Sequence, residues 1–404
     1  MKVGIGVGTQ RDILSCVKEA AEQARSKLGK SRIDLAILFS SADMASPSLL
    51  KTASEKLGDI SLVGCSGAAV ISSLGIHHHA LAIALISSED TVTLNTSYVK
   101  DVSSKTPFTA GRELSDKIQM DFRSGHKELL TVFSDGTIND SYKFILGLQE
   151  NFGTIFPMIG GLASDNLRFR KTYLYFNRTL LNDAATGILW GGKFSFGLGI
   201  RHGFSPIGKH RVITRGHDNI IETINNKPAV SLYEEYFAMS FSQLKSEIRT
   251  ISRIYPIGVY LDNEKEYLIR CVTGVEENGS LICRGDIMNG ATLRMMIGTK
   301  ERFIEAAGQA TEDAKQDLTM AKFGTTYEQS PKVDLALVFS SAFRYTFLKK
   351  NIVEELKEMQ RSLGSTTPIL GVYTYGEFAP LKGVGSKGQA YYQNNSIAVL
   401  TLGS

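Results

Sequence analysis

The chain has 404 residues, of which 43% are hydrophobic and 21% are charged, and its formal net charge is +4. These values are ordinary for a globular protein of two or three domains. The small charge, without a dense run of lysine and arginine, argues against nucleic acid as a partner. No stretch approaches the roughly 18 consecutive apolar residues of a membrane span, and the N-terminus lacks the apolar segment of a signal peptide. We therefore predict a cytoplasmic protein whose four cysteines are free thiols.

One apolar phrase occurs three times along the chain. Residues 34–42 read DLAILFSSA, residues 334–342 read DLALVFSSA, and residues 129–135 carry the looser copy LLTVFSD. Internal repetition of this kind indicates a repeated structural unit. Because nearly every position is apolar, each copy is predicted to be a buried strand that is covered on both faces.

The same succession of elements is predicted around each copy. A helix over 12–28 comes first, and its start is capped by Asp12. The first unit then has a strand over 33–39, a helix over 46–57, a short strand over 61–64 and a strand over 79–86. The second unit has a strand over 129–133, a helix over 139–152, and a short strand and loop over 157–166. The third has a strand over 333–339, a helix over 347–363, a short strand and loop over 368–377, and a strand over 396–402.

Strands separated by helices favour parallel pairing of the first two strands in each unit. The fold class predicted is therefore α/β, with mixed, largely parallel β-sheets flanked by helices and built from repeated strand-helix-strand units. Between the second and third units the pattern changes to short strands, a strong hairpin turn at 277–280 and a long helix over 300–323. This change predicts two domains, residues 1–220 and residues 221–404.

Several phrases are shared with a known family. They read GCS at 64–66, GGLASD at 160–165, RHGFSPIG at 201–208, FSSAFR at 339–344 and GVYTYGEF at 371–378. With these phrases, in this order over nearly the whole chain, the protein resembles the FIST proteins, which carry a FIST N-terminal and a FIST C-terminal domain. The resemblance implies an intracellular sensory module for signal transduction, not an enzyme. It also implies a small ligand, amino acids among the candidates, and a separate signalling partner such as a histidine kinase.

The third unit departs most from the other two where its strands end. Arg344 follows the third copy of the phrase, and Tyr373, Tyr375 and Glu377 follow the next strand. The carboxyl ends of parallel strands meet at a ligand-binding edge, so these side chains are predicted to form a binding site, to which Asn395 adds an amide. Arginine offers a planar fork to a carboxylate, and glutamate accepts from an ammonium, which suits an amino-acid zwitterion. The other interpretation is a structural ion pair between Arg344 and Glu377.

Two further hypotheses remain open. Some FIST proteins resemble haem proteins that sense nitric oxide and regulate a histidine kinase, and here His202 would be the preferred axial ligand. An ordinary histidine at the edge of the core is the alternative reading of His202, and no other cofactor is predicted. A protein-interaction scaffold without a small ligand is the third hypothesis.

No catalytic residue is predicted. The chain has no G-x-S-x-G elbow, and Cys65 lacks an evident base. The glycines Gly64 and Gly160 do not fit a phosphate-binding loop, because no helix starts at them and no lysine follows. Close packing of the backbone or a turn is the predicted reason for both glycines.

Overall fold

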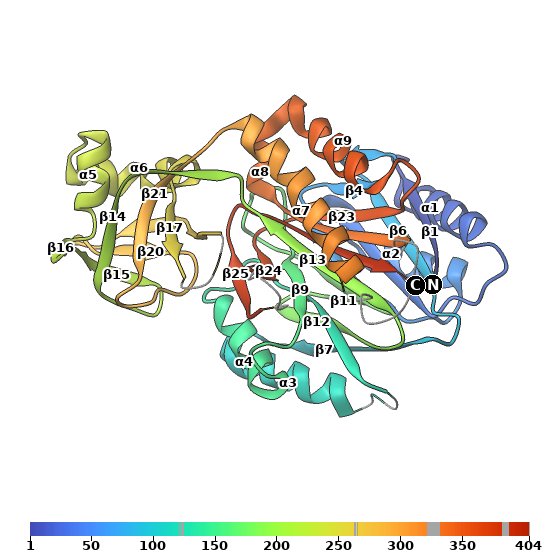
Figure 1. Ribbon diagram of the computed structural model, residues 1–404. Helices are drawn as coiled ribbons and strands as arrows, with labels where there is room; N and C mark the ends of the chain where they lie inside the picture. The colour runs from blue at the N-terminus through green and yellow to red at the C-terminus, as the bar shows by residue number, and fades with distance from the viewer. Residues whose placement is uncertain are drawn as a thin grey trace.

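The computed structural model describes residues 1–120, 122, 125–261, 264, 266–320, 332–381 and 388–403. Within these residues, three six-stranded sheets and their helices form a large body, and a further sheet with two helices forms a lobe at one end (Figure 1). This arrangement confirms the predicted α/β class with mixed sheets. Among the described helices, none combines the length and the apolar character that a membrane span needs.

The same four-stranded order recurs in each sheet of the body, and the strand that carries the repeated phrase is always third. The first sheet has the order β1 (Lys2–Gly8), β6 (Leu81–Ser87), β2 (Leu35–Ser41) and β3 (Leu62–Gly67). The second sheet has β7 (Val92–Lys100), β12 (Ala184–Gly192), β8 (Lys127–Ser134) and β9 (Met158–Leu162). The third has β13 (Ser195–Arg201), β26 (Ile397–Gly403), β22 (Val333–Ser341) and β23 (Ile369–Thr374).

Pairing within these sheets is less parallel than the sequence predicted. We call the strand that carries the repeated phrase (β2, β8 or β22) the phrase strand. In all three sheets it pairs in parallel with the short strand that follows it along the chain. It pairs antiparallel with the closing strand on its other side. The reason is that only the first of these connections contains a helix, which is what a parallel crossover needs. Each sheet is therefore mixed, with one parallel ladder among the described strands.

A hairpin from each unit extends the sheet of another unit. Strands β4 (Val70–Ser72) and β5 (Gly75–His77) follow β3 along the chain but extend the sheet of β23. Strands β10 (Leu174–Phe176) and β11 (Thr179–Leu181) follow β9 but extend the sheet of β3. Strands β24 (Glu377–Pro380) and β25 (Ala390–Gln393) follow β23 but extend the sheet of β9. This cyclic exchange joins the three units into one body.

The phenylalanines of the three phrase copies meet at the centre of the body. The ring centroid of Phe133 lies 5.5 Å from that of Phe39 and 5.9 Å from that of Phe339, and the third pair is 6.3 Å apart. All three side chains are fully buried. The repeated phrase thus supplies a shared core as well as a repeated strand.

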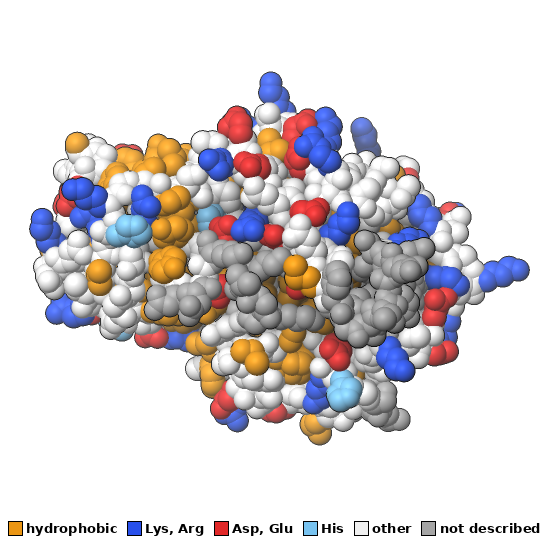
Figure 2. Space-filling view, in the orientation of Figure 1, with side chains coloured by type: hydrophobic (Ala, Val, Ile, Leu, Met, Phe, Trp, Pro, Cys, Tyr) orange, Lys and Arg blue, Asp and Glu red, His pale blue; other side chains and the backbone are white. Residues whose placement is uncertain are grey.

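Helices cover the outer faces of the body sheets (Figure 1). They are α1 (Ile13–Leu28), α2 (Pro47–Leu57), α3 (Pro107–Met120), α4 (Tyr142–Phe152), α7 (Lys300–Met320), α8 (Ala342–Leu348) and α9 (Ile352–Leu363). Residues 321–323 of the predicted long helix lie outside the described residues. On the face shown in Figure 2, basic and acidic side chains are interspersed, as the small net charge leads one to expect.

The glycines of the short strands are sites of close backbone approach. A Cβ atom at Gly64 would lie 1.7 Å from the carbonyl oxygen of Leu38, and one at Gly160 would lie 1.8 Å from that of Val132. Both distances are far below van der Waals contact, so only glycine fits. The predicted packing role of these glycines is confirmed.

The lobe is inserted between β13 and α7 of the third unit. Its strands are β14 (Phe204–His217), β15 (Ile220–Ile224), β16 (Lys227–Pro228), β17 (Ile257–Tyr260), β18 (Leu268–Arg270), β19 (Val272–Val275), β20 (Leu281–Cys283) and β21 (Thr292–Gly298), and its helices are α5 (Ser231–Phe237) and α6 (Phe241–Ile254). The boundary predicted between residues 220 and 221 lies within this lobe, at the start of β15. Residues on both sides of the lobe contribute to the third body sheet, because β13 pairs with β26.

Candidate functional site

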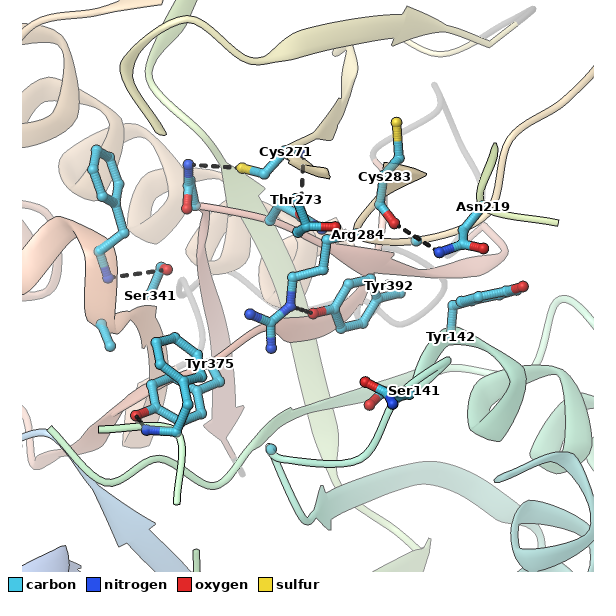
Figure 3. Close-up of a pocket in the computed structure, with 18 of the residues that line it drawn as sticks. Ser141, Tyr142, Asn219, Cys271, Thr273, Cys283, Arg284, Ser341, Tyr375 and Tyr392 are labelled. Carbon is cyan, nitrogen blue, oxygen red and sulfur yellow. Dashed lines mark hydrogen bonds between the residues drawn. The ribbon is translucent and has the colours of Figure 1, made fainter. Parts of the chain in front are cut away.

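A cavity of about 700 Å³ lies between the body and the lobe. On the body side it is lined by the loop after β8 (136–141), by Ser341 at the end of β22 and by Thr374 at the end of β23. These are the carboxyl ends of two of the three strands that carry the repeated phrase, β8 and β22, and of the short strand β23, and this is the edge at which α/β sheets bind ligands. On the lobe side it is lined by residues of α6, β19 and β20. Figure 3 shows side chains from both parts around the opening.

Arg284, just after β20, reaches into this cavity from the lobe (Figure 3). Its Nε donates to the hydroxyl of Tyr392 over 2.7 Å, and its guanidinium lies 5.8 Å from the ring centroid of Phe169. These contacts orient the half-buried side chain. Its neighbour Arg270 pairs with Asp286, but Arg284 forms no salt bridge within the described part of the chain. Its two terminal nitrogens are therefore available to an anionic partner.

Two more arginines lie on the same wall. Arg249 and Arg253 are one helical turn apart on α6, so they project from the same side of the helix. The Nε of Arg249 donates to the carbonyl of Thr273 on β19 over 2.6 Å. Both arginines are exposed, and neither forms a salt bridge with a described residue. The lobe wall of the cavity is consequently cationic.

An amide on the cavity wall has an unused donor. Asn394 is only 4% exposed, and its Oδ1 accepts from the backbone N–H of Cys271 over 3.3 Å. Its Nδ2 has no hydrogen-bond partner among the described residues. A buried donor without a partner is costly, and a ligand acceptor or a water molecule would satisfy it.

The thiols on the cavity wall are not activated. Burial raises the pKa of Cys271 to about 12, although Arg284 and Arg253 act in the opposite direction. Burial likewise raises the pKa of Cys283 to about 12. Because the thiolate is the nucleophilic form, neither thiol has the character of a catalytic cysteine at neutral pH.

Two of the residues predicted for a ligand site line this cavity. The ring of Tyr375 stacks on that of Phe169 at 4.2 Å with 12° between the planes, and its hydroxyl donates to the carboxylate of Asp165. The Nδ2 of Asn395 donates to the Cys271 sulfur over 3.1 Å and to the Arg253 carbonyl over 3.4 Å. The structure thus brings Tyr375 and Asn395 to one site.

Arg344 and Tyr373 are instead buried behind the cavity and are not on its wall. The Nε of Arg344 donates to Glu355 over 2.8 Å, and the Tyr373 hydroxyl donates to the other oxygen of the same carboxylate over 3.1 Å. Arg344 also donates to the carbonyls of His202 and Phe303. The alternative of a structural ion pair therefore applies to Arg344, but its partner is Glu355 on α9 and not Glu377.

Glu377 is also fully buried, beneath the cavity residue Thr374. Its carboxylate accepts from the Thr374 hydroxyl over 2.8 Å, from the Ser396 hydroxyl over 2.6 Å and from the Ser396 N–H over 3.2 Å. It has no salt bridge within the described chain. Burial, opposed by these hydrogen bonds, raises the pKa of Glu377 from 4.5 to about 7.

The raised pKa of Glu377 predicts a pH dependence of stability. Between pH 4.5 and about 7 the unfolded carboxyl is ionised while the folded one holds a proton. The folded state then binds more protons, so stability falls as pH rises through this window and is constant above it. The fall is expected to be on the order of 3 kcal/mol. Urea unfolding at pH 5 and pH 8 should show a drop in stability that is smaller in Glu377→Gln than in the wild type by about this amount, while other groups with raised pKa values, such as Glu355, contribute equally in both.

Glu354, whose side chain is 41% exposed, provides the control for this experiment. Its carboxylate pairs with Lys357 at the surface of α9. Replacement of Glu354 by glutamine should leave the pH dependence of unfolding as in the wild type. Equal pH dependence in the wild type and in Glu377→Gln would contradict a raised pKa of Glu377.

His202 does not fit the role of a haem ligand. Its Nδ1 accepts from the backbone N–H of Phe204 over 2.8 Å, and its Nε2 lies 2.8 Å from the carboxylate of Glu266. An axial ligand needs one ring nitrogen free for iron. The side chain is buried near the crossing from body to lobe, and no histidine is among the described residues that line the cavity. Neither His202 nor a described residue of the cavity wall therefore offers an axial histidine to haem.

Sequence reasoning missed the cationic side of the site. Arg249, Arg253 and Arg284 all belong to the lobe, which carries no copy of the repeated phrase. No helix is predicted from the sequence over 241–254, so the four-residue spacing that places Arg249 and Arg253 on one face of α6 was missed. That they face the ends of the body strands follows only from the tertiary structure.

Comparison with known proteins places the chain in a family. The model of the FIST N domain matches residues 34–227, and the model of the FIST C domain matches residues 229–380. The chain therefore belongs to the FIST family, whose domains are sensory domains of signal transduction.

Several known proteins are similar to this chain at low sequence identity. An uncharacterized protein of Mycobacterium tuberculosis is 23% identical over 400 residues, which cover 95% of this chain and 96% of that protein. An uncharacterized protein of Methanocaldococcus jannaschii is 28% identical over 204 residues, but these cover 46% of this chain and 39% of that protein. A solved cyanuric acid hydrolase aligns over 99% of both chains with 8% identity and a TM-score of 0.38.

Proposed function

We propose that this protein is a cytoplasmic sensor that binds a small polar ligand in the cavity between body and lobe. The ligand carries an anionic group, such as a carboxylate, which Arg284 holds. The observation that carries the proposal is that Arg284 lines the cavity with its Nε bound to Tyr392, while its two terminal nitrogens form no hydrogen bond or salt bridge with the described residues. That free edge matches the two oxygens of a carboxylate.

The other wall suits the remainder of an amino-acid-like ligand. Asp140 and the side-chain oxygen of Asn395 are acceptors that an ammonium group requires, and both residues line the cavity from the body. The unused donor of Asn394 supplies a further contact for a ligand oxygen. A ligand of this kind would contact body and lobe together.

We propose binding without catalysis, with the signal passed to a separate protein such as a histidine kinase. What supports the first part is the state of the nucleophiles on the wall. The two thiols have pKa values of about 12. The hydroxyl of Ser341 accepts from the Phe343 N–H over 3.4 Å and has no histidine beside it among the lining residues.

Replacement of Arg284 by glutamine is expected to weaken ligand binding by about 10- to 100-fold. A hydrogen bond to a charged group contributes about 1.5–3 kcal/mol, and each 1.4 kcal/mol is tenfold in affinity. Thermal-shift screening of the wild type against amino acids and small carboxylic acids identifies binders, because binding to the native state raises the melting temperature. Calorimetric titration then gives the affinity of each variant.

Two variants test the specificity of this result. Arg284→Lys keeps the charge but loses the planar fork, and it should restore only part of the affinity. Lys209→Gln removes an exposed charge of the lobe that does not line the cavity, and it should leave binding unchanged. Binders that retain full affinity in Arg284→Gln would place the site elsewhere.

A further inference from the structure

We infer that the cavity has a second anionic subsite at Arg249 and Arg253, and that the ligand is a short dicarboxylate. This class includes the acidic amino acids. The inference rests on the proposed function, since it assigns the second end of a ligand whose first carboxylate is on Arg284.

The first argument is charge. Three arginines line the cavity, whereas Asp140 is the one acidic residue among its described lining residues. Asp140 is itself partly neutralised, because its carboxylate lies 3.6 Å from the Nζ of Lys143. A ligand with a single negative charge therefore leaves the cavity with an excess of positive charge. A second carboxylate on the ligand lowers that excess.

The second argument comes from the series of basic residues along α6. Lys245, Arg249 and Arg253 follow one another at intervals of four, which aligns three like charges on one side of the helix. Lys245 forms a salt bridge with Glu277, and it does not line the cavity. The two arginines that reach the cavity are the ones without a carboxylate partner in the described chain. Unpaired cations gathered at a cavity mark a site for an anion.

The third argument places the two subsites on one wall of the cavity. The backbone N–H of Arg284 donates to the Cys271 carbonyl over 2.8 Å, and the Nε of Arg249 donates to the Thr273 carbonyl over 2.6 Å. Cys271 and Thr273 are two residues apart, so both arginines contact the same short segment of the lobe. The thiol of Cys271 lies within electrostatic reach of both Arg284 and Arg253. One short ligand with a carboxylate at each end therefore meets both subsites on this wall.

The test compares ligands that differ by one charge at nearly constant size. The probes are L-glutamate against L-glutamine, and glutarate against its monoamide, titrated by calorimetry into the full chain. The wild type is expected to bind the dicarboxylate at least about tenfold more tightly than its monoamide, a preference worth 1.4 kcal/mol. In the variant Arg249→Gln/Arg253→Gln the ratio of the affinity for the dicarboxylate to that for its monoamide should fall to nearly one. The control Lys209→Gln/Lys245→Gln removes the same charge from the lobe surface and should keep the wild-type preference.

The outcomes separate this inference from the proposed function. Arg284→Gln should weaken both members of each pair by a similar factor, because both retain the first carboxylate. Equal wild-type affinity for dicarboxylate and monoamide, with a loss in Arg284→Gln, overturns the second subsite and leaves the proposed function standing. A preference that survives Arg249→Gln/Arg253→Gln also overturns it. Absence of binding by every probe also overturns the second subsite, while the screen against amino acids and small carboxylic acids tests the proposed function separately.

Discussion

Replacement of Arg344 by alanine is expected to lower the free energy of unfolding by about 3–5 kcal/mol. The change leaves the carboxylate of Glu355 fully buried without its cationic partner. It also removes the donors to the carbonyls of His202 and Phe303, which lie where the chain leaves the body for the lobe and where it returns. Urea unfolding followed by circular dichroism measures the loss.

Two further variants show whether the loss comes from the buried pair. In Arg344→Met/Glu355→Leu both charges are replaced by apolar groups, and most of the stability should return. Arg361→Ala removes an arginine that pairs with Glu358 at the surface and is 76% exposed, so its effect should stay within about 0.5 kcal/mol. A variant Arg344→Ala that keeps wild-type stability but loses ligand binding would contradict this structural role and would support the site predicted from the sequence.

The contrast between Arg344 and Arg284 shows what local sequence signals can predict. Arg344 follows a phrase strand at the edge where ligands bind, so its position along the chain suggested a ligand contact. Its true partner is 11 residues away on α9, and the same arginine binds backbone groups from two distant segments. Arg284 carries no motif, and it becomes a candidate only because the lobe places it against the body. In both cases the tertiary structure, and not the position along the chain, determines what the arginine contacts.

The same distinction applies to the fold. The phrase predicted the buried strands, and the spacing predicted the helix between the two parallel strands of each unit. The exchange of hairpins was not predictable, because short strands such as β4 and β10 carry no signal for the sheet that they join. Hydrophobic pattern identifies which residues are buried, but it does not identify their neighbours.

The central phenylalanines test whether the three repeated units are energetically coupled. Phe133→Ala is expected to lower the free energy of unfolding by about 3–5 kcal/mol, because a large buried side chain is lost and the cavity relaxes only partly. Its ring contacts with Phe39 and Phe339 add to this loss. Trp190 on β12, the single tryptophan of the chain, reports on the second unit, while circular dichroism reports on all three. In Phe133→Ala the urea midpoints of the fluorescence and dichroism transitions should fall together.

A double-mutant cycle gives the control. Phe39→Ala and Phe133→Ala remove two rings that touch each other, so their effects should deviate from additivity by about 0.5–3 kcal/mol. Phe156→Ala removes a half-buried ring that contacts Phe152 and lies outside the central trio, so it should add to Phe39→Ala without coupling. Strict additivity of Phe39→Ala and Phe133→Ala, or a fluorescence transition that moves while the dichroism transition stays, would mean that the units unfold independently. The shared aromatic contact and the hairpin exchange both oppose that outcome, because each makes the stability of one unit depend on its neighbours.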